Sequence, residues 1–440
     1  MNAVIVAVAI MLVLSLFRVH VVIALLLGAL AGGFIADFTI LETIDIFSGG
    51  LGGNAVVALS YALLGGFAVA LSKTGLPRVI VDLAVKMVGK DDETRKKSLS
   101  KVLLILVILT ISIFSQNVIP IHIAFIPILI PPLLQVLNEL KVDRRAIATV
   151  ITFGLKAPYI LIPAGFGLIF HEIIQINMEE SGLIIKMSDI PVAMLLPILG
   201  MVVGLIFALL FSYRKSRIYK NKQINQEVAV SVEPISRRAI VVSLVAIIAA
   251  LVAQIVTESM ILSALVGIVI LLFSGKMNVK NTEEYLTDGM KMMAFIGFVM
   301  ITASGFAAVI RETGHVDLLV EQSVGIIGAN QGLAAILMLL VGLFITMGIG
   351  SSFSTIPIIA TLFVPLSLAV GFSPMATIAL IGTAAALGDA GSPASDSTLG
   401  PTAGLNADGQ HNHIWDTCVP TFLHFNIPLI IFGWIAAMVL

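Results

Sequence analysis

Long apolar runs, each near the roughly 20 residues that one helix needs to cross a bilayer, recur along most of the chain. Hydrophobic residues make up 58% of the 440 residues and charged residues only 12%, which is about half the charged share of a typical soluble domain. The sequence therefore predicts an all-α integral membrane protein in a lipid bilayer. The runs predict transmembrane helices near residues 2–17, 19–36, 54–72, 189–213, 238–256, 260–274, 291–310 and 414–440.

Four further apolar stretches are interrupted by polar or helix-breaking residues. Residues 101–138 and 332–371 are each long enough for two passes but contain a polar tip followed by a proline, so each predicts a re-entrant hairpin. Residues 145–175 and 374–404 each contain a Gly/Pro-rich segment and predict one broken transmembrane helix. Backbone without helical hydrogen bonds is tolerated at this depth only against protein or in a wet cavity, so we expect the four interruptions to face one another.

The second half of the chain repeats the first. LSKTG at 71–75 recurs as IRETG at 310–314, and FSQNVIPI at 114–121 recurs as SSFSTIPI at 351–358. Secondary transporters are often built from such repeats, with broken helices that meet near the bilayer midplane. We therefore expect an inverted repeat of two five-helix halves, each with a re-entrant hairpin and a broken transmembrane helix. The expected parts are a first transmembrane repeat (1–188), a connecting transmembrane helix (189–213), a cytoplasmic linker (214–236), a second, inverted repeat (237–405) and a C-terminal transmembrane helix (406–440).

Charged residues occupy alternate loops. Lys and Arg gather in 73–101, 141–145 and 214–238, whereas the intervening loops are acidic, as at Asp37 and Glu42. Because basic loops face the cytoplasm, this pattern predicts a multi-pass protein of the cell membrane with both termini outside. Residues 76–90 and 315–328 have the composition of amphipathic interfacial helices. The net charge of −1 gives no basic surface for nucleic acid.

Two aspartates and a lysine lie inside otherwise apolar spans. Asp389 and Asp396 occupy the second predicted break, where an unpaired charge costs roughly 2.5–3.5 kcal/mol. Both are candidates for binding a cation, and the alternative is that one of them caps the half-helix that follows. Lys156 lies at the first predicted break. It could pair with an aspartate of the other half, receive the carboxylate of a substrate, or extend to the membrane surface.

Small polar residues at the predicted hairpin tips and in the second break complete the candidate site. Half-helix N-termini after the tips would suit a bound carboxylate, and the oxygen-rich side chains would suit Na⁺, which we place at Asp389, Asp396 and Asn117. The alternative for hydroxyl residues is a hydrogen bond to a carbonyl one turn earlier. Besides the charged residues, the candidates are Ser115, Gln116, Asn117, Ser351, Ser352, Ser354, Thr355, Ser392, Ser395 and Thr398.

The segment GDAGSPASDSTLGPTAGL at 388–405, together with the paired hairpin tips and the length of the chain, resembles the bacterial Na⁺/H⁺ antiporter family of the ion transporter superfamily. The resemblance covers nearly the whole chain and matches the family pattern G-D-x-x-S-P-x-S-D-x-T. Better-known branches have His-Cys after Gly-Asp, where this chain has Ala390 and Gly391, so a titratable neighbour of the aspartate is missing. Some relatives under the same family name resemble amino-acid permeases, including permeases for histidine.

Two functions remain open at this point. The first is a Na⁺- or H⁺-coupled transporter of a small amino acid, with histidine or another basic amino acid among the candidates. The second is a Na⁺/H⁺ antiporter that exchanges cations directly. The serines have no evident His/Asp partner, so we do not expect an enzyme, and no cofactor is expected beyond Na⁺ or H⁺ as coupling ion. The expected partners are the bilayer and a small-molecule substrate, and the sequence leaves a homodimer open.

Overall fold

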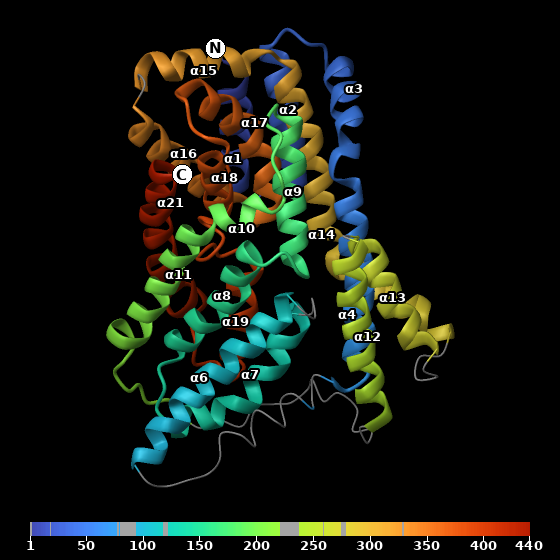
Figure 1. Ribbon diagram of the computed structural model, residues 1–440, viewed down its shortest axis with the longest axis vertical. Helices are drawn as coiled ribbons and strands as arrows, with labels where there is room; N and C mark the ends of the chain where they lie inside the picture. The colour runs from blue at the N-terminus through green and yellow to red at the C-terminus, as the bar shows by residue number, and fades with distance from the viewer. Residues whose placement is uncertain are drawn as a thin grey trace.

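A computed structural model of the chain describes residues 2–17, 19–76, 79, 94–117, 122–220, 237–257, 259–273, 279–327 and 330–440. The regular elements in this part of the chain are all helices, with no β-strand among them (Figure 1). Within it, seven helical segments are long and apolar enough to cross a membrane, and the bent pair α8 and α9 would make an eighth. The predicted all-α membrane fold is confirmed. The predicted helix at 76–90 and most of the predicted linker lie outside the described residues.

The first half of the chain follows the predicted helices with one correction. Residues 37–53 were expected to form a loop, but α3 (Ile40–Gly50) and a 3₁₀ turn, η1 (Leu51–Asn54), occupy most of it. Thr39 and Glu42 form a capping box that starts α3, which explains helix formation by these polar residues. The other helices are α1 (Ala3–Leu16), α2 (Val21–Ile35), α4 (Ala55–Lys73), α6 (Thr94–Asn117), α7 (His122–Glu139), α8 (Arg144–Leu161) and α9 (Phe166–Glu180).

The connecting helix is divided into α10 (Asp189–Ala193), α11 (Leu195–Phe207) and a π-helical turn, η2 (Ala208–Ser212). In the second half α14 (Val279–Glu312) starts well before the predicted residue 291. The predicted interfacial helix is present as α15 (His315–Ile327), which lies across the upper end in Figure 1. The remaining helices are α12 (Arg237–Thr257), α13 (Met260–Phe273), α16 (Gln331–Ile349), α17 (Ser352–Val370), α18 (Pro374–Ala386), α19 (Asp396–Leu405), η3 (His413–Cys418), α20 (Val419–Thr421), η4 (Phe422–Asn426) and α21 (Ile427–Val439).

The two helical hairpins lie toward opposite ends of the molecule. In Figure 1 the pair α6 and α7 lies at the lower end, whereas α16 and α17 lie in the upper part. Opposite placement is what an inverted pair of halves would produce, but the inversion and the bounds of the five parts stay predictions. Beside the hairpins, α4 packs closely on α14, since a Cβ added at Gly65 would lie 2.3 Å from the carbonyl oxygen of Gly289.

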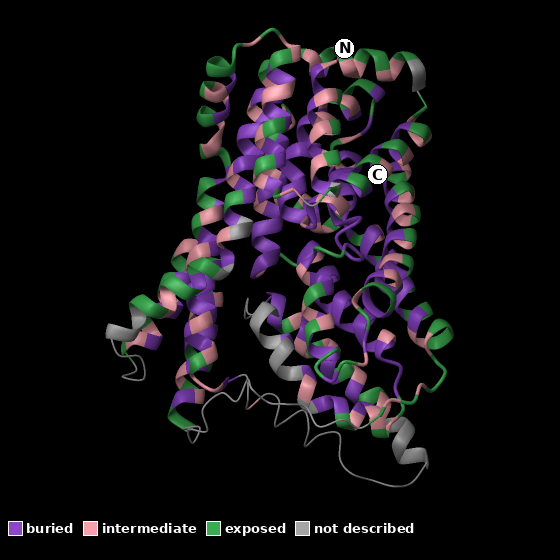
Figure 2. Cartoon of the chain, turned by 180° about the vertical axis from the view of Figure 1, so that it is seen from behind, coloured by how far each residue is buried: buried purple, intermediate pink, exposed green. Residues whose placement is uncertain are grey.

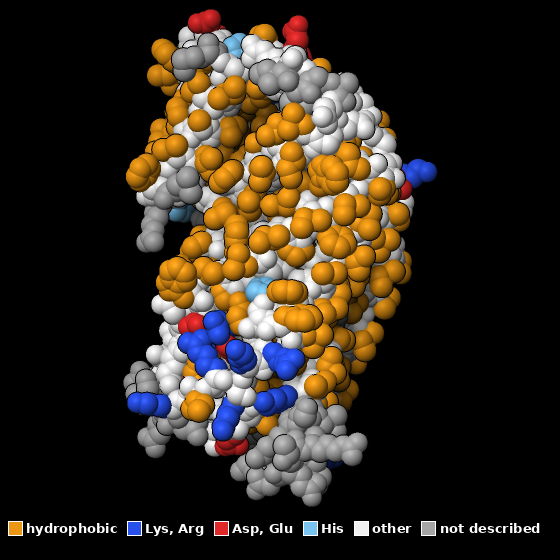
Figure 3. Space-filling view, turned by 90° about the vertical axis from the view of Figure 1, so that its left-hand side faces the viewer, with side chains coloured by type: hydrophobic (Ala, Val, Ile, Leu, Met, Phe, Trp, Pro, Cys, Tyr) orange, Lys and Arg blue, Asp and Glu red, His pale blue; other side chains and the backbone are white. Residues whose placement is uncertain are grey.

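The surface has the composition of a protein in lipid. Buried residues fill the centre (Figure 2), while a broad hydrophobic surface covers the face seen in Figure 3. Large apolar side chains such as Phe34, Phe207 and Phe273 are exposed, and in water such a surface would promote aggregation. Lys and Arg gather toward the lower end in Figure 3. The chain is therefore a multi-pass membrane protein.

Candidate functional site

The first break, residues 162–165, lies against the end of the first hairpin helix. The Asn117 side chain donates hydrogen bonds to the carbonyl oxygens of Ile162 (3.4 Å) and Ala164 (3.0 Å). Gly165 has a φ of 59°, and a Cβ there would lie 2.3 Å from the Asn117 carbonyl oxygen, so only glycine fits. Its N–H donates to Oε1 of Gln254, a buried residue of α12 (3.3 Å). The uncharged side-chain amides of Asn117 and Gln254 therefore hydrogen-bond the backbone groups of this break.

The second break, residues 387–395, is held by hydrogen bonds to Asn426 and to the end of α16. Asn426 accepts from the N–H of Gly388 (2.9 Å) and donates to the carbonyl oxygen of Ala390 (2.6 Å). The Ser392 hydroxyl donates to the carbonyl oxygen of Met347 at the end of α16 (3.2 Å). Gly388 has a φ of 79°, which non-glycine residues rarely adopt. Backbone freed from helical hydrogen bonds is thus paired with protein, as the buried depth requires.

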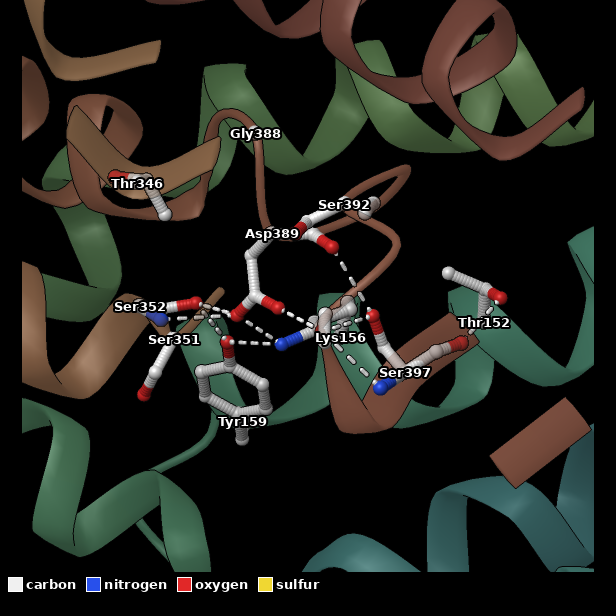
Figure 4. A network of polar contacts seen from close by, with 12 residues as sticks. Thr152, Lys156, Tyr159, Thr346, Ser351, Ser352, Gly388, Asp389, Ser392 and Ser397 are labelled. Atoms are coloured by element: carbon white, nitrogen blue, oxygen red, sulfur yellow. Dashed lines mark hydrogen bonds and ion pairs between the residues drawn. The ribbon is translucent and has the colours of Figure 1, made fainter. Parts of the chain in front are cut away.

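Asp389 is the centre of a charged network between the two halves (Figure 4). Its carboxylate is 1% exposed and accepts hydrogen bonds from the Lys156 ammonium and from the hydroxyls of Ser352 and Ser395. The backbone N–H of Ser352, at the start of α17, is a further donor at 3.0 Å. The positive end of a half-helix therefore faces a carboxylate, as expected, but that carboxylate belongs to the protein itself.

Lys156 does not extend to the membrane surface. The residue is only 8% exposed, and besides Asp389 its ammonium donates to the Tyr159 hydroxyl at 3.3 Å. The prediction that Lys156 lies in the break was wrong, since α8 continues to Leu161 despite Pro158. The proposed pairing of this lysine with an aspartate of the other half is observed. Its role in binding stays a prediction.

Asp396 differs from Asp389 in having no comparable set of donors. It lies in the first turn of α19, and its carboxylate accepts no hydrogen bond from the described part of the chain. The cap of α19 is Ser395, whose hydroxyl accepts from the N–H of Ser397 at 3.2 Å. The alternative in which an aspartate caps this half-helix was therefore wrong.

Several predicted tip residues bind their own helix. Ser115 donates to the carbonyl oxygen of Ser112 (2.8 Å) and Thr355 to that of Ser351 (2.9 Å), so the one-turn alternative holds for both. Thr398 likewise donates to the carbonyl oxygens of Ser392 and Ser395, within its own segment. The Ser354 hydroxyl donates to the Ser351 hydroxyl at 3.4 Å.

The candidate residues of the first tip lie at the end of a helix, and the helix that follows the tip, α7, begins at His122. Residues 115–117 form the last turn of α6, so the helix end at this tip is the negative one and does not suit an anion. Residues 118–121 lie outside the described residues. Asn117 is bound to the first break and is not among the residues that line the cavity described next, so the structure does not gather Asp389, Asp396 and Asn117 into one Na⁺ site.

A cavity opens beside the charged network. It encloses about 430 Å³ of atom-free space, including its open mouth. Among the described residues, the hydroxyl of Tyr61 and Oε1 of Gln116, both lining residues, are buried without a hydrogen-bond partner. Tyr61 also packs on two other lining rings, with ring centroids 5.4 Å from Phe166 and 5.8 Å from Phe353. The lining residues are Tyr61, Gln116, Leu155, Lys156, Phe166, Gly350, Ser351, Phe353, Asp389, Ser395, Asp396 and Ser397.

Two tyrosines and two amides that position or line this site are among the residues that sequence reasoning missed. Tyr61 and Tyr159 were not among the candidates, although Tyr159 accepts from Lys156 and bonds the Ser352 hydroxyl at 2.7 Å. Gln254 is a lone amide within the apolar run of α12, and Asn426 a lone amide between Phe425 and Ile427. Buried amides are expensive without partners, so these two could have been found by the reasoning that singled out the aspartates.

A second buried ion pair joins the ends of the same helices that carry the site. Arg144, the first residue of α8, is fully buried, and both of its terminal nitrogens bind Asp408 just after α19, at 2.7 and 2.6 Å. Arg144 also donates to the carbonyl oxygen of Leu405 (2.8 Å). Burial would raise the pKa of Asp408, but hydrogen bonds from Arg144 and Gln410 outweigh burial and hold that pKa below its usual range.

Comparisons with known proteins agree with this architecture. The model of the Na⁺/H⁺ antiporter family matches residues 150–434, and a second model of a Na⁺-H⁺ antiporter family matches residues 2–88. YuiF of Bacillus subtilis, whose name gives amino acid transport as its provisional role, is 58% identical over the full length of both chains.

Two solved structures share the fold. The YdaH transporter of Alcanivorax borkumensis matches with a TM-score of 0.62 and 14% identity, over 90% of this chain and 87% of its own. MtrF of Neisseria gonorrhoeae matches with a TM-score of 0.61 and 15% identity, over 91% and 84%. At this level of identity the similarity extends to the fold alone.

Proposed function

Since the chain belongs to the Na⁺/H⁺ antiporter family, we propose that it is a secondary transporter that moves a small amino acid together with Na⁺ or H⁺. Membership of this family establishes that the protein is a transporter. The cargo and the coupling ion are the proposal, and the name of YuiF supports an amino acid.

The observation that carries the proposal is the buried pair of Lys156 and Asp389. A site that only exchanges cations needs carboxylates, and a buried lysine next to them adds a desolvation cost without binding the cation. For an amino acid the same lysine is useful, because its ammonium and the N–H of Ser352 can bind the cargo carboxylate. The lysine lines the cavity, so the cargo could reach it.

The charge of Asp389 couples binding of the cargo to binding of the cation. When a cargo carboxylate takes Lys156 and the start of α17, Asp389 loses its strongest donors while it stays buried. A bare carboxylate in such a place is unfavourable, and it is relieved by Na⁺ or by a proton. Cargo and cation therefore stabilise each other's binding. This reciprocal stabilisation is the thermodynamic requirement for cotransport.

The second candidate is a Na⁺/H⁺ antiporter in which the cation displaces Lys156 from Asp389 directly. The description of the family and the two carboxylates of the second break favour it. In this case no amino acid binds, and Lys156 acts as the counter-charge of Asp389 whenever the cation is absent.

One experiment separates the two functions. The purified protein in proteoliposomes is given an inward Na⁺ gradient, and uptake of each of the twenty amino acids is measured in the same vesicles as Na⁺-dependent change of internal pH. We expect concentrative uptake of at least one amino acid that requires the gradient of Na⁺ or H⁺. Vesicles carrying Asp288→Asn, a change in an exposed ion pair of α14, are the control. Robust Na⁺/H⁺ exchange without uptake of any amino acid would overturn the proposal in favour of the antiporter.

A further inference from the structure

The two aspartates of the second break have different surroundings, although they are seven residues apart in one motif. Asp389 accepts from Lys156 and from two serines, so its charge is compensated within the protein. Asp396 lines the same cavity but accepts no hydrogen bond from the described residues. The three charged side chains of the cavity, Lys156, Asp389 and Asp396, thus leave one negative charge in excess, and it is located on Asp396.

Two buried polar groups without partners line the cavity together with Asp396. Tyr61 is 1% exposed and Gln116 is 4% exposed, yet the Tyr61 hydroxyl and Oε1 of Gln116 have no hydrogen-bond partner in the part of the chain that the structure describes. A buried polar atom left unpaired costs roughly 1–3 kcal/mol, so native proteins rarely keep one without a reason. Tyr61 comes from α4, Gln116 from the end of α6 and Asp396 from α19, so three separate elements bring oxygen acceptors to one cavity.

The walls of the cavity select the kind of cation. Phe166, Phe353 and the ring of Tyr61 border it, and the centroids of the two phenylalanine rings lie within 6 Å of the Tyr61 ring centroid. Aromatic faces attract organic ammonium groups, whereas a hard metal cation is best served by a shell made of oxygen atoms. A charged acceptor, two neutral acceptors and apolar rings together match a primary ammonium group, which has three N–H donors.

We propose that Asp396, Tyr61 and Gln116 form the receptor for the ammonium group of the cargo, while Asp389 serves the coupling cation. This inference rests on the proposed function, since it assigns the positive end of the amino acid whose carboxylate goes to Lys156. The two tasks are divided between two aspartates of one motif. Removal of either charge should therefore affect a different ligand.

The test is a binding measurement on the full-length protein in detergent, separate from transport. Thermal stability is followed while two kinds of ligand are titrated: the amino acid found by uptake, with n-butylamine as a probe of the ammonium subsite alone, and Na⁺. We expect Asp396→Asn to weaken binding of the amino acid and of n-butylamine by at least about tenfold, because a charge-assisted hydrogen bond is lost. Tyr61→Phe should weaken both by a few fold, and Asp389→Asn should abolish the stabilisation by Na⁺ while n-butylamine still binds. Asp288→Asn is the matched control for an Asp to Asn change.

Each other outcome decides against the inference or against the proposed function. If Asp396→Asn and Tyr61→Phe bind n-butylamine as the wild type does, or if n-butylamine never stabilises the wild type, the receptor assignment is wrong. If Asp396→Asn removes the response to Na⁺ instead, Asp396 belongs to the coupling ion and the assignment is wrong. If n-butylamine binding depends on Asp396 but no amino acid is taken up by the proteoliposomes, the receptor stands and the proposed cargo fails.

Discussion

The two breaks of the membrane-embedded helices occupy matching positions in the two halves but contain different chemistry. The first, residues 162–165, has no charged side chain and is satisfied by the amides of Asn117 and Gln254. The second, residues 387–395, contains Asp389, whose carboxylate is bound by hydroxyls and by Lys156. The two breaks are thus complementary: Asp389 of the second break is compensated by Lys156, which lies on the helix that ends at the first break.

The hairpin tips differ in the same way. Gln116 lies in the last turn of α6, where carbonyl groups point outward, and Ser352 lies in the first turn of α17, where N–H groups do. A helix C-terminus attracts cations and an N-terminus attracts anions. The asymmetry agrees with the assignment of a cargo ammonium near Gln116 and a carboxylate near Ser352.

The strongest test of complementarity is to remove the positive charge of the first half. Lys156→Met leaves Asp389 buried without its main partner, so we expect loss of transport and a destabilisation of about 3–5 kcal/mol. Thermal unfolding in detergent and uptake into proteoliposomes measure the two effects. The double variant Lys156→Met/Asp389→Asn removes both charges, so it should regain most of the stability without regaining transport. A double variant no more stable than Lys156→Met would mean that the two residues do not compensate each other.

The second buried ion pair, Arg144 with Asp408, should affect stability more than transport. Asp408→Asn leaves Arg144 buried without its counter-charge, and we expect a loss of about 3 kcal/mol. The folded pKa of Asp408 lies below its ordinary value of 3.8, so the carboxylate contributes stability above that value. This contribution is lost as pH falls through the lower, folded pKa. The difference in unfolding temperature between wild type and variant should therefore be constant near neutral pH and shrink below about pH 4.

The exposed pair of Asp288 and Lys291 is the control for this prediction. Asp288→Asn should change stability by less than about 1 kcal/mol, because solvent screens exposed ion pairs. An equal effect of both variants would contradict the structural role of the buried pair.

The smallest predicted effect separates tertiary contact from local backbone strain. Gly165 and Gly182 both have positive φ, at 59° and 95°, but only Gly165 is in contact with another segment at its Cβ position. Gly182→Ala should cost about 1 kcal/mol from strain alone. Gly165→Ala adds a clash with the Asn117 backbone and should cost about 2 kcal/mol more. Unfolding temperatures of the two variants, compared with wild type, measure the difference. Equal losses of stability would mean that a Cβ at Gly165 does not clash with the Asn117 backbone.

The fold could be predicted closely because its signals are local. Apolar runs of bilayer length give α12 and α16, and the proline, glycines and serines of 387–395 interrupt the helix that α18 and α19 would otherwise form. The early start of α14 and the helix α3 were not expected, since polar residues such as Glu42 and Asp45 in an apolar chain resemble a loop. Capping by Thr39 and packing of α3 against α14 favour the helix there.

The site was predicted only in part. The buried aspartates and the lysine are visible in the sequence because a charge inside an apolar run is costly wherever the chain folds. Whether Ser115 faces a ligand or its own helix depends on the rotation of α6, which the apolar sequence around it does not define. Nothing in the sequence around Tyr61 indicates a site. Its role becomes visible only in the structure, where Tyr61 lines the same cavity as Asp389 and Asp396.

By itself the sequence determined that this chain lies in a membrane, where its apolar stretches are interrupted and that Lys156, Asp389 and Asp396 place charge inside them, because hydropathy, proline and ionisation act locally on the chain. Only the tertiary structure decided that Lys156 meets Asp389, 233 residues away, and that Asp396 is left to the cavity. Such pairing depends on how helices distant in sequence pack against one another. Many residues of an apolar helix could face that interior equally well, and packing selects among them.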